Sequence, residues 1–248
     1  MFEIKNRNGD VLFRDDDARD AREAMAIAME HGADLSGAQL ARADLSKRDF
    51  ADAVLTDANL DGVNLDGANL ENADLSRASL VGATLRGANL ENASLVGADI
   101  SNAAFDGANL ERADLRDARA ERARFPRANL ERSCLENLRG DGAVMSRANL
   151  ERANLRHARL ANAEIVAANL ERCDLRGAEM PFAVFEASNL ERADLRRANL
   201  TGANLHEANL EKCDVDEAIL DGANTDGANF DGVRGTPRPP AASNPPYR

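Results

Sequence analysis

Aromatic residues are nearly missing from this sequence of 248 residues, which has no Trp, one Tyr and eight Phe. A conventional core built on aromatic side chains is therefore excluded. Ala, Leu, Asn, Asp and Arg dominate the composition instead. Any core has to come mainly from Leu and Ala.

Cysteine is also scarce, and neither a long apolar run nor the pattern of a leader peptide is found. Cys134, Cys173 and Cys213 show no CxxC or metal-type spacing, which indicates small buried side chains in a reducing compartment. The charged start MFEIKNRNGD lacks the apolar region of a signal peptide, and no run of about 18 apolar residues is present. We expect a soluble cytoplasmic protein. Its formal net charge of −12 argues against a general nucleic-acid binder.

A repeat of five residues runs through most of the chain. Of the 40 positions taken every fifth residue from 35 to 230, 27 are Leu, and Ala stands two residues earlier at 33 of them. Most of the other positions hold a large apolar residue, with Ala120, Gly140 and Thr225 as exceptions. The repeating unit is A-(D/N)-L-x-x, and its frame never slips.

A period of five fits neither a helix nor a flat strand. Residues five apart would wind around a helix and would alternate between the two faces of a strand. The period works if the chain bends once per repeat, so that Ala and Leu point inward and the x-x pair forms a corner. Gly at many second-x positions, such as Gly62 and Gly67, suits such corners.

The number of sides comes from a longer repeat. The tripeptide NLE recurs every 20 residues from 69 to 209, so four pentapeptides make one coil with four sides. Ten such coils, stacked at about 4.8 Å, predict a rod roughly 48 Å long. Burying each Leu contributes about 2 kcal/mol, so a narrow core can still carry the fold.

This pattern resembles that of the pentapeptide repeat proteins over residues 33–232. The resemblance implies an all-β fold, a right-handed quadrilateral parallel β-helix. The handedness rests on the resemblance alone.

The two ends of the chain predict different structures. In residues 1–32, FEIKNRNGDVLFR is typical of a hairpin around an Asn-Gly turn, and residues 17–31 favour a helix that ends at Gly32. We expect hairpin and helix to cap the first coil, because open solenoid ends associate. Residues 233–248 are Pro-rich and predicted to be disordered. The last coil is then covered either by a second copy, giving a two-fold homodimer, or by this tail.

The NLE repeats place like residues above one another on one side of the rod. We expect an amide ladder with hydrogen bonds from coil to coil. Its central members are Asn109, Asn129, Asn149, Asn169 and Asn189. Glu stacks beside this ladder and Arg or Lys follows, which is most simply explained as charge balancing and otherwise as a binding surface.

Charge varies along the rod, with net −7 in residues 33–110, +2 in 111–199 and −7 in 200–232. The last of these segments suggests an acidic partner surface. Its candidate residues are Asp216, Glu217, Asp221, Asp226 and Asp231.

One stretch of the middle segment departs from the repeat. Ala120 and Gly140 are undersized for inward positions and Leu138 replaces the usual Ala, which predicts a dented or bulged wall. Outward positions on the same side carry three stacked arginines, Arg119, Arg139 and Arg159. These either find counter-ions within the chain or form a site for an anion or acidic partner on the dent. The candidate counter-ions are Glu121, Asp141 and Glu164.

No catalytic, metal or cofactor site is predicted. His31, His157 and His206 are scattered, and no nucleophile-base set, metal-ligand spacing or phosphate-binding loop occurs. We therefore expect a non-enzymatic scaffold that presents a rigid surface to a protein partner.

The alternative function comes from the family resemblance, which includes proteins that mimic B-DNA, bind DNA gyrase and give fluoroquinolone resistance. The +2 middle segment and the lack of an evident C-terminal helix or interrupting loop count against it. Direct nucleic-acid binding through the Arg-rich middle is weaker still, because stacking aromatics are nearly absent.

Overall fold

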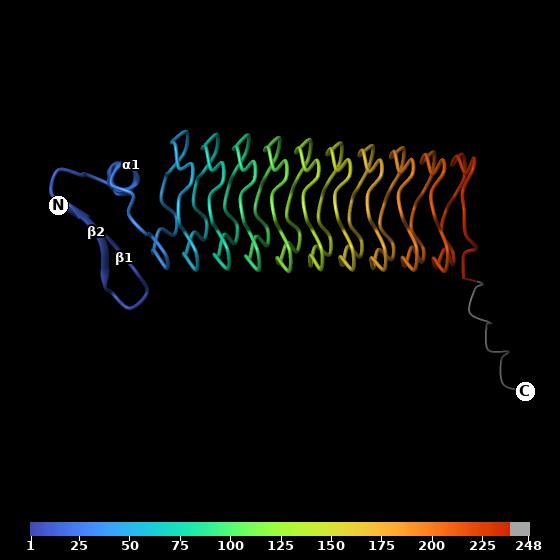
Figure 1. The fold of residues 1–248 in the computed structure, drawn as a ribbon, viewed down its shortest axis with the longest axis horizontal. Coiled ribbons are helices and arrows are strands. Elements are labelled where there is room, and N and C mark those ends of the chain that lie inside the picture. The colour runs from blue at the N-terminus through green and yellow to red at the C-terminus, as the bar shows by residue number, and fades with distance from the viewer. Residues whose placement is uncertain (239–248) are drawn as a thin grey trace, which may run out of the picture.

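The computed structural model describes residues 1–238. It is a rod of stacked coils, with a two-stranded hairpin and one helix at its N-terminal end (Figure 1). The hairpin consists of β1 (Phe2–Lys5) and β2 (Val11–Asp15), and the helix is α1 (Ala21–Glu30). No helix in the described residues is long and apolar enough to cross a membrane.

The hairpin forms where the Asn-Gly turn is predicted. β1 and β2 pair antiparallel from Phe2↔Asp15 to Lys5↔Val11, with an irregularity after Ile4. Asn6 organises the connection, because its side-chain Oδ1 accepts hydrogen bonds from the backbone N–H groups of Asn8 and Asp10 at 2.9 and 3.0 Å. The Asn6 side chain thus satisfies two backbone N–H groups of the turn that would otherwise be bonded to water.

The helix is shorter than the predicted 17–31. The Asp15 carboxylate accepts hydrogen bonds from the backbone N–H groups of Asp17 and Ala18 at 2.9 and 2.7 Å, which holds this stretch outside the helix. Asp20 is the N-cap, since it is extended and accepts from the N–H of Glu23 at 2.9 Å. The helix therefore starts at Ala21.

The hairpin and helix contact the first coils directly. The buried helix residues Ala24, Met25 and Ala28 belong to the same apolar cluster as the coil core. Arg22 donates from Nη2 to the carbonyl of Ser46 at 2.9 Å. The N–H of Gln39 donates to the carbonyl of Lys5 at 2.8 Å, so the hairpin also bonds to the solenoid.

The coils are joined by parallel β-bridges between residues 20 apart. The bridges run from Gln39↔Asn59 to Asp214↔Arg234, with one bridge in every pentapeptide. At a typical bridge, Leu70 donates to the carbonyl of Asn89 at 2.6 Å. Each 20-residue coil therefore has four short bridged segments, and away from the two ends of the rod each segment is paired with the coils before and after it.

Each corner is a tight turn with an unusual backbone conformation. The N–H of Ala73 donates to the carbonyl of Leu70 at 3.0 Å, closing a four-residue turn, and Asn72 has a φ of 57°. A positive φ at this third position is characteristic of type II turns. Residues other than Gly occupy most of these corners, Arg112 among them at φ 56°, although a left-handed conformation costs them about 1 kcal/mol each.

The core is a column of inward Leu and Ala that stays buried along the rod. Phe105 and Phe125, one coil apart, stack with their ring centroids 5.0 Å apart and their planes at 10°. The C-terminal end is more open: Phe230 is 37% exposed, whereas Leu210, the equivalent residue one coil earlier, is fully buried.

Residues 233–238 continue the solenoid, where disorder is predicted from 233 onward. The N–H groups of Val215 and Glu217 donate to the carbonyls of Arg234 and Thr236, each at 2.9 Å, and Arg238 donates to Ala218 at 2.8 Å. The rest of the predicted tail, 239–248, lies outside the described residues.

Candidate binding surface

One side of the rod, the ladder side, carries a continuous column of Asn side chains. Each amide nitrogen donates to the amide oxygen one coil earlier at 3.0–3.2 Å. Each oxygen also accepts the backbone N–H of the Glu two residues later at 3.1–3.2 Å. The central members are Asn109, Asn129, Asn149, Asn169 and Asn189. Because the oxygens are used twice within the chain, the ladder needs no external partner.

The charges on the ladder side are also paired within the chain. Arg112 lies 3.0 Å from Glu111 and 3.2 Å from Glu91. The corresponding Arg–Glu neighbours on the following coils lie 3.3–3.6 Å apart. Exposed pairs of this kind contribute only about 0–1 kcal/mol each. Their main effect is to balance charge on a stacked surface.

The basic side, defined by Arg119, Arg139 and Arg159, is different. These three residues lie above one another, since Arg139 forms parallel bridges with both of the others. Arg119 has Asp99 and Glu121 at 3.7 and 3.8 Å. In residues 1–238 no hydrogen bond or ion pair involves the guanidinium of Arg139 or Arg159.

Of the three predicted counter-ions, Glu121 alone lies near an arginine of the basic side in residues 1–238. Glu121 approaches Arg119 and also accepts from the hydroxyl of Ser101 at 2.9 Å. Asp141 instead accepts the backbone N–H of Ala161 at 3.0 Å. Glu164 forms no ion pair with the basic side in the described region. The guanidiniums of Arg139 and Arg159 therefore form no ion pair with a carboxylate of residues 1–238.

The predicted dent or bulge behind the basic side is wrong. The backbone ladder continues through it, with Gly140 donating to Arg159 at 2.7 Å and Ala120 donating to Arg139 at 2.6 Å. A Cβ added at Gly140 would lie 3.3 Å from Leu138 Cδ2 and 3.0 Å from Leu160 Cδ2. Leu138 thus fills the volume that Gly140 leaves, and the basic side is a regular wall.

A corner next to the basic side holds a further unpaired arginine, Arg156, that the sequence reasoning missed. On other coils the equivalent Arg bonds to the Asp two residues earlier, as Arg176 does from Nε to Asp174 at 2.7 Å and Arg196 to Asp194 at 2.8 Å. The hydrogen bonds that both guanidiniums donate to these aspartates raise the pKa of Arg176 and Arg196.

Arg156 lacks this arrangement because residue 154 is Asn. The Asn154 amide donates to Glu136 at 3.3 Å and offers no charge to Arg156. The Nε of Arg156 is buried and has no hydrogen-bond partner in the described residues. Arg116, Arg176 and Arg196 each follow an Asp by two residues, whereas Arg156 follows Asn154, and this difference is the sequence signal that could have identified this corner.

Two clefts meet at His157, the neighbour of Arg156. One has a volume of about 320 Å³ and is lined by Arg156 and His157, by Gly177, three further arginines and Asp216 of the next coils. The other, of about 300 Å³, is lined by His157, by Arg139 and Arg159 of the basic side, and by Asp117 and Asn137. Gly177 leaves room for the His157 ring, since an added Cβ would lie 2.7 Å from its Nδ1.

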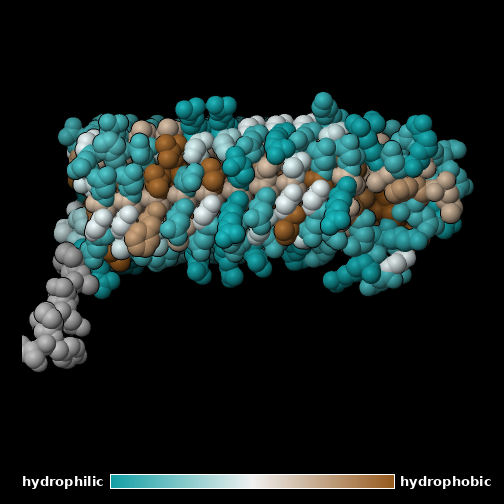
Figure 2. Space-filling view, turned by 180° about the vertical axis from the view of Figure 1, so that it is seen from behind, coloured by the Kyte–Doolittle hydropathy of each residue, from teal (hydrophilic) through white to brown (hydrophobic). Residues whose placement is uncertain are grey.

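The opposite border of the basic side carries an exposed aromatic residue. Phe182 occupies the corner that follows this side and is 60% exposed. Its ring lies over Gly202, where an added Cβ would meet Phe182 Cδ1 at 2.6 Å. The face of the rod in Figure 2 is mostly hydrophilic, with apolar residues in small areas between. In residues 1–238 five large apolar side chains are exposed, and Phe182 is the more exposed of the two that are aromatic.

The predicted acidic surface is not a single face. Asp216, Asp221, Asp226 and Asp231 begin four successive corners, so they encircle the last coil. Glu217 accepts from Arg197 Nε at 2.7 Å and is partly neutralised.

The histidines and cysteines do not assemble into a reactive site in residues 1–238. His31 ends α1 and His206 contacts the carbonyl of Asp226 at 2.9 Å, on a different side from His157. Burial raises the pKa of Cys173 and Cys213, and each thiol donates to a backbone carbonyl. No group of three or more potential metal ligands occurs in the described chain.

Comparison with known sequences identifies the repeat. The family described as pentapeptide repeats matches with 8 copies, over residues 33–72, 73–112, 103–137, 141–177 and 178–216. The chain belongs to the pentapeptide repeat family. No curated protein sequence is significantly similar to it.

Solved structures of pentapeptide repeat proteins are similar to this family member. HetL from the cyanobacterium Nostoc, involved in heterocyst differentiation regulation, is 28% identical with a TM-score of 0.63, over 85% of this chain and 92% of HetL. QnrB1, a plasmid-mediated fluoroquinolone resistance protein, is 19% identical with a TM-score of 0.41, over 66% of this chain and 86% of its own. The likeness to HetL supports the assignment as a pentapeptide-repeat β-helix.

Proposed function

We propose that this pentapeptide repeat protein is a non-enzymatic scaffold that binds a protein partner through its basic side. The observation that carries the proposal is that the guanidiniums of Arg139 and Arg159 have no partner in residues 1–238 and are bordered by the exposed ring of Phe182. The ladder side satisfies its own polar groups, whereas the basic side leaves charge and apolar surface for another molecule.

This combination of residues suits protein recognition. Arg and aromatic side chains are enriched among the residues that dominate binding energy at interfaces. The bridged coils hold them on a stiff wall, so little ordering of the backbone opposes association. Membership of a family of binding scaffolds and the likeness to HetL, a protein involved in regulation, support a regulatory role.

We further infer the finer architecture from the family. The solenoid is taken as a right-handed quadrilateral β-helix, with residues 1–32 as its N-terminal cap. The open last coil, where Phe230 is 37% exposed, is proposed to pair with a second copy. Light scattering tests the homodimer: a particle of twice the 26.7 kDa chain mass supports it, and a monomer at all concentrations refutes it.

The second candidate is a DNA-mimicking modulator of DNA gyrase. The net charge of −12 and the acidic last coil favour it. The distribution of charge counts against it, because the acidic residues encircle that coil and the middle of the rod carries arginines that have no partner in residues 1–238. A gyrase supercoiling assay with and without a fluoroquinolone decides this candidate: inhibition or drug protection at micromolar protein would support it.

Site-specific photo-crosslinking tests the main proposal. A benzophenone amino acid replaces Phe182 in one variant and Asn72 in another, since Asn72 is an exposed corner residue beside the ladder side with a similar φ of 57°. In lysate from the native cells we expect a discrete protein adduct at position 182 and not at 72. The same adducts at both positions, or none at 182, would refute the basic side as the partner surface.

A further inference from the structure

The two clefts that share His157 form a continuous basic surface around one corner of the rod. Arg139 and Arg159 contribute from the basic side, and Arg156 contributes from the corner. None of these three guanidiniums has a hydrogen bond or ion pair within residues 1–238. Asp117 and Asp216 also line the clefts, but the arginines outnumber them, so this corner concentrates positive charge in a molecule whose net charge is −12.

The charge at this corner is a local departure from the repeat. Asp174 and Asp194 neutralise the arginines of the neighbouring coils, whereas Asn154 leaves Arg156 uncompensated. The buried, unpartnered Nε of Arg156 is a second sign, since a guanidinium nitrogen without a partner costs free energy unless a ligand supplies an acceptor.

We propose that these clefts bind an acidic segment of the protein partner, with carboxylates of the segment on both sides of the His157 ring. The inference rests on the proposed function, because it names the chemistry of the same partner. Guanidiniums bind carboxylates through paired, charge-assisted hydrogen bonds. A segment with several acidic side chains reaches Arg156 in one cleft and Arg139 and Arg159 in the other.

The arrangement favours such a segment over other anions. A single compact anion fills only one of the two clefts. A long nucleic acid would extend over the flanking coils, where residues 33–110 and 200–232 each carry net −7, and like charges would repel it. Apart from His157, neither cleft is lined by a ring on which a base could stack.

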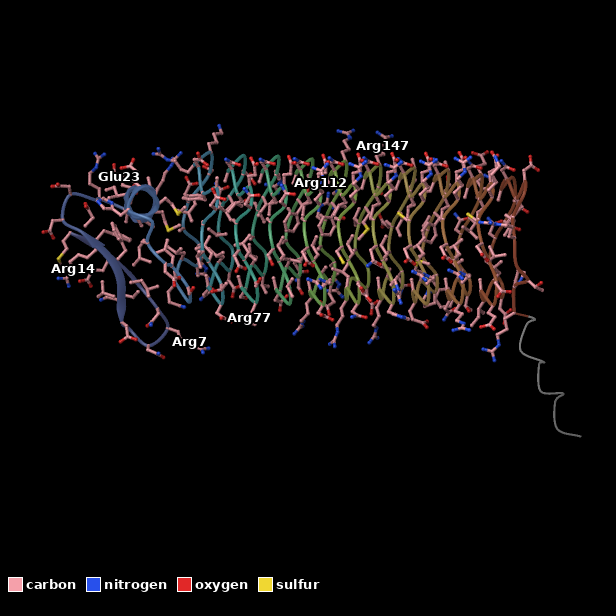
Figure 3. The ribbon with its side chains drawn as sticks, viewed as in Figure 1. Arg7, Arg14, Glu23, Arg77, Arg112 and Arg147 are labelled. Carbon is pink, nitrogen blue, oxygen red and sulfur yellow. The ribbon has the colours of Figure 1, made fainter. Side chains whose placement is uncertain are left out.

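Fluorescence anisotropy with a labelled hexaglutamate peptide tests the proposal on the full chain. We expect wild-type binding at low salt that weakens as salt rises, and Arg156→Gln should weaken it about tenfold, as expected for loss of a charge-assisted contact. Arg147→Gln is the matched control, because Arg147 is also unpaired in the described chain but projects from another edge of the rod (Figure 3). It should change affinity less than twofold.

Asn154→Asp provides an independent variant that supplies the missing carboxylate. It recreates the arrangement of Asp174 and Arg176, so it should weaken hexaglutamate binding about tenfold, as Arg156→Gln does, while Asn102→Asp, with the same charge change at an exposed corner, should change it less than twofold. Circular dichroism melts verify that each variant is folded. Equal binding by Arg156→Gln and Arg147→Gln, or no wild-type binding at low salt, would overturn the proposal.

Competition separates the remaining ligand classes. Inorganic phosphate or duplex DNA that displaces hexaglutamate at lower concentration than unlabelled peptide would overturn the assignment to an acidic segment. In the crosslinking experiment, a partner still captured at position 182 by the Arg156→Gln variant as efficiently as by wild type would refute this site alone. If the chain with benzophenone at position 182 and no other change gives no adduct, the proposed function itself is refuted.

Discussion

The ladder side and the basic side share one backbone but differ in how they use their polar groups. On the ladder side, Asn149 donates to Asn129 and accepts from Asn169, and Glu151 is paired with Arg152. On the basic side, Arg139 and Arg159 stack on bridged strands with no acceptor in the described residues. Strict repetition closes bonds within the protein, and departures from it leave groups that other molecules can use.

The same contrast appears within one corner. Arg176 and Arg156 are equivalent residues one coil apart, yet only Arg176 has a carboxylate beside it. The difference comes from Asp174 and Asn154, a change of one atom type and one charge. Surface chemistry in a solenoid is therefore best located by comparing equivalent positions across coils.

The largest expected effect concerns the core behind the basic side. Leu138→Ala should lower the free energy of unfolding by about 2–5 kcal/mol, because Gly140 cannot fill the cavity. Gly140→Leu should cost about 1–3 kcal/mol, since Leu138 and Leu160 already occupy the space. The double variant restores the Ala-x-Leu order of other repeats and should be close to wild type in urea denaturation. Additive losses in the double variant would contradict the volume exchange.

The second prediction separates stability from binding on the two sides. Asn149→Ala breaks two ladder hydrogen bonds and the bond to the Glu151 N–H, so it should cost about 1–3 kcal/mol. Arg159→Gln should change stability by no more than about 0.5 kcal/mol but weaken hexaglutamate binding. Urea denaturation and anisotropy on both variants check this. If Arg159→Gln proved the more destabilising, the side chain would have a structural role.

The sequence predicted the architecture well because one constraint repeats in every pentapeptide. One bend per pentapeptide accounts for the inward Ala and Leu, the corner residues with positive φ and the 20-residue spacing of Asn. Because 40 in-frame copies repeat the same pattern, the bend is predicted many times over. The hairpin was also predicted, from local turn chemistry. The helix start was not, because Asp15 and Asp20 compete as caps and only the structure shows which one precedes the helix.

The site was harder to predict because it depends on pairing between coils. The arginine row at 119, 139 and 159 is visible in the sequence, but whether Glu121 or Asp141 neutralises it depends on side-chain geometry. Leu138 stands at a position that is usually Ala, and Gly140 at one that is usually Leu, so the total side-chain volume is nearly conserved. When each position is judged by itself, the small Gly140 wrongly predicts a dent. Arg156 was overlooked because Arg recurs at its position, and the informative change lies two residues earlier, at Asn154.

A third, smaller effect is expected at the wall between the two clefts. Gly177→Ala places a Cβ 2.7 Å from His157 Nδ1 in a backbone with φ of 65°. It should cost about 1 kcal/mol for the left-handed conformation and displace the His157 ring, which weakens hexaglutamate binding. Gly87→Ala has a similar φ of 62° with no atom within 4 Å, so it isolates the backbone cost. Equal effects of both variants on binding would exclude the His157 ring from the site.

The smallest expected effect concerns thiol labelling, which tests whether the coils open locally at the side that follows the ladder side. The Cys213 thiol is buried, donates to the carbonyl of Leu190 at 2.9 Å, and has its pKa raised by burial to about 12. At pH 8 only about one molecule in ten thousand would then carry the thiolate, which is the reactive form. Iodoacetamide should therefore label the partly exposed Cys134 and spare Cys173 and Cys213 until urea unfolds the rod. Mass spectrometry of timed samples checks this, with Cys134→Ser as the control for labelling at that site. Labelling of Cys213 at the rate of Cys134 in the native protein would mean that the coils open locally, and the ladder could then no longer be treated as a closed wall.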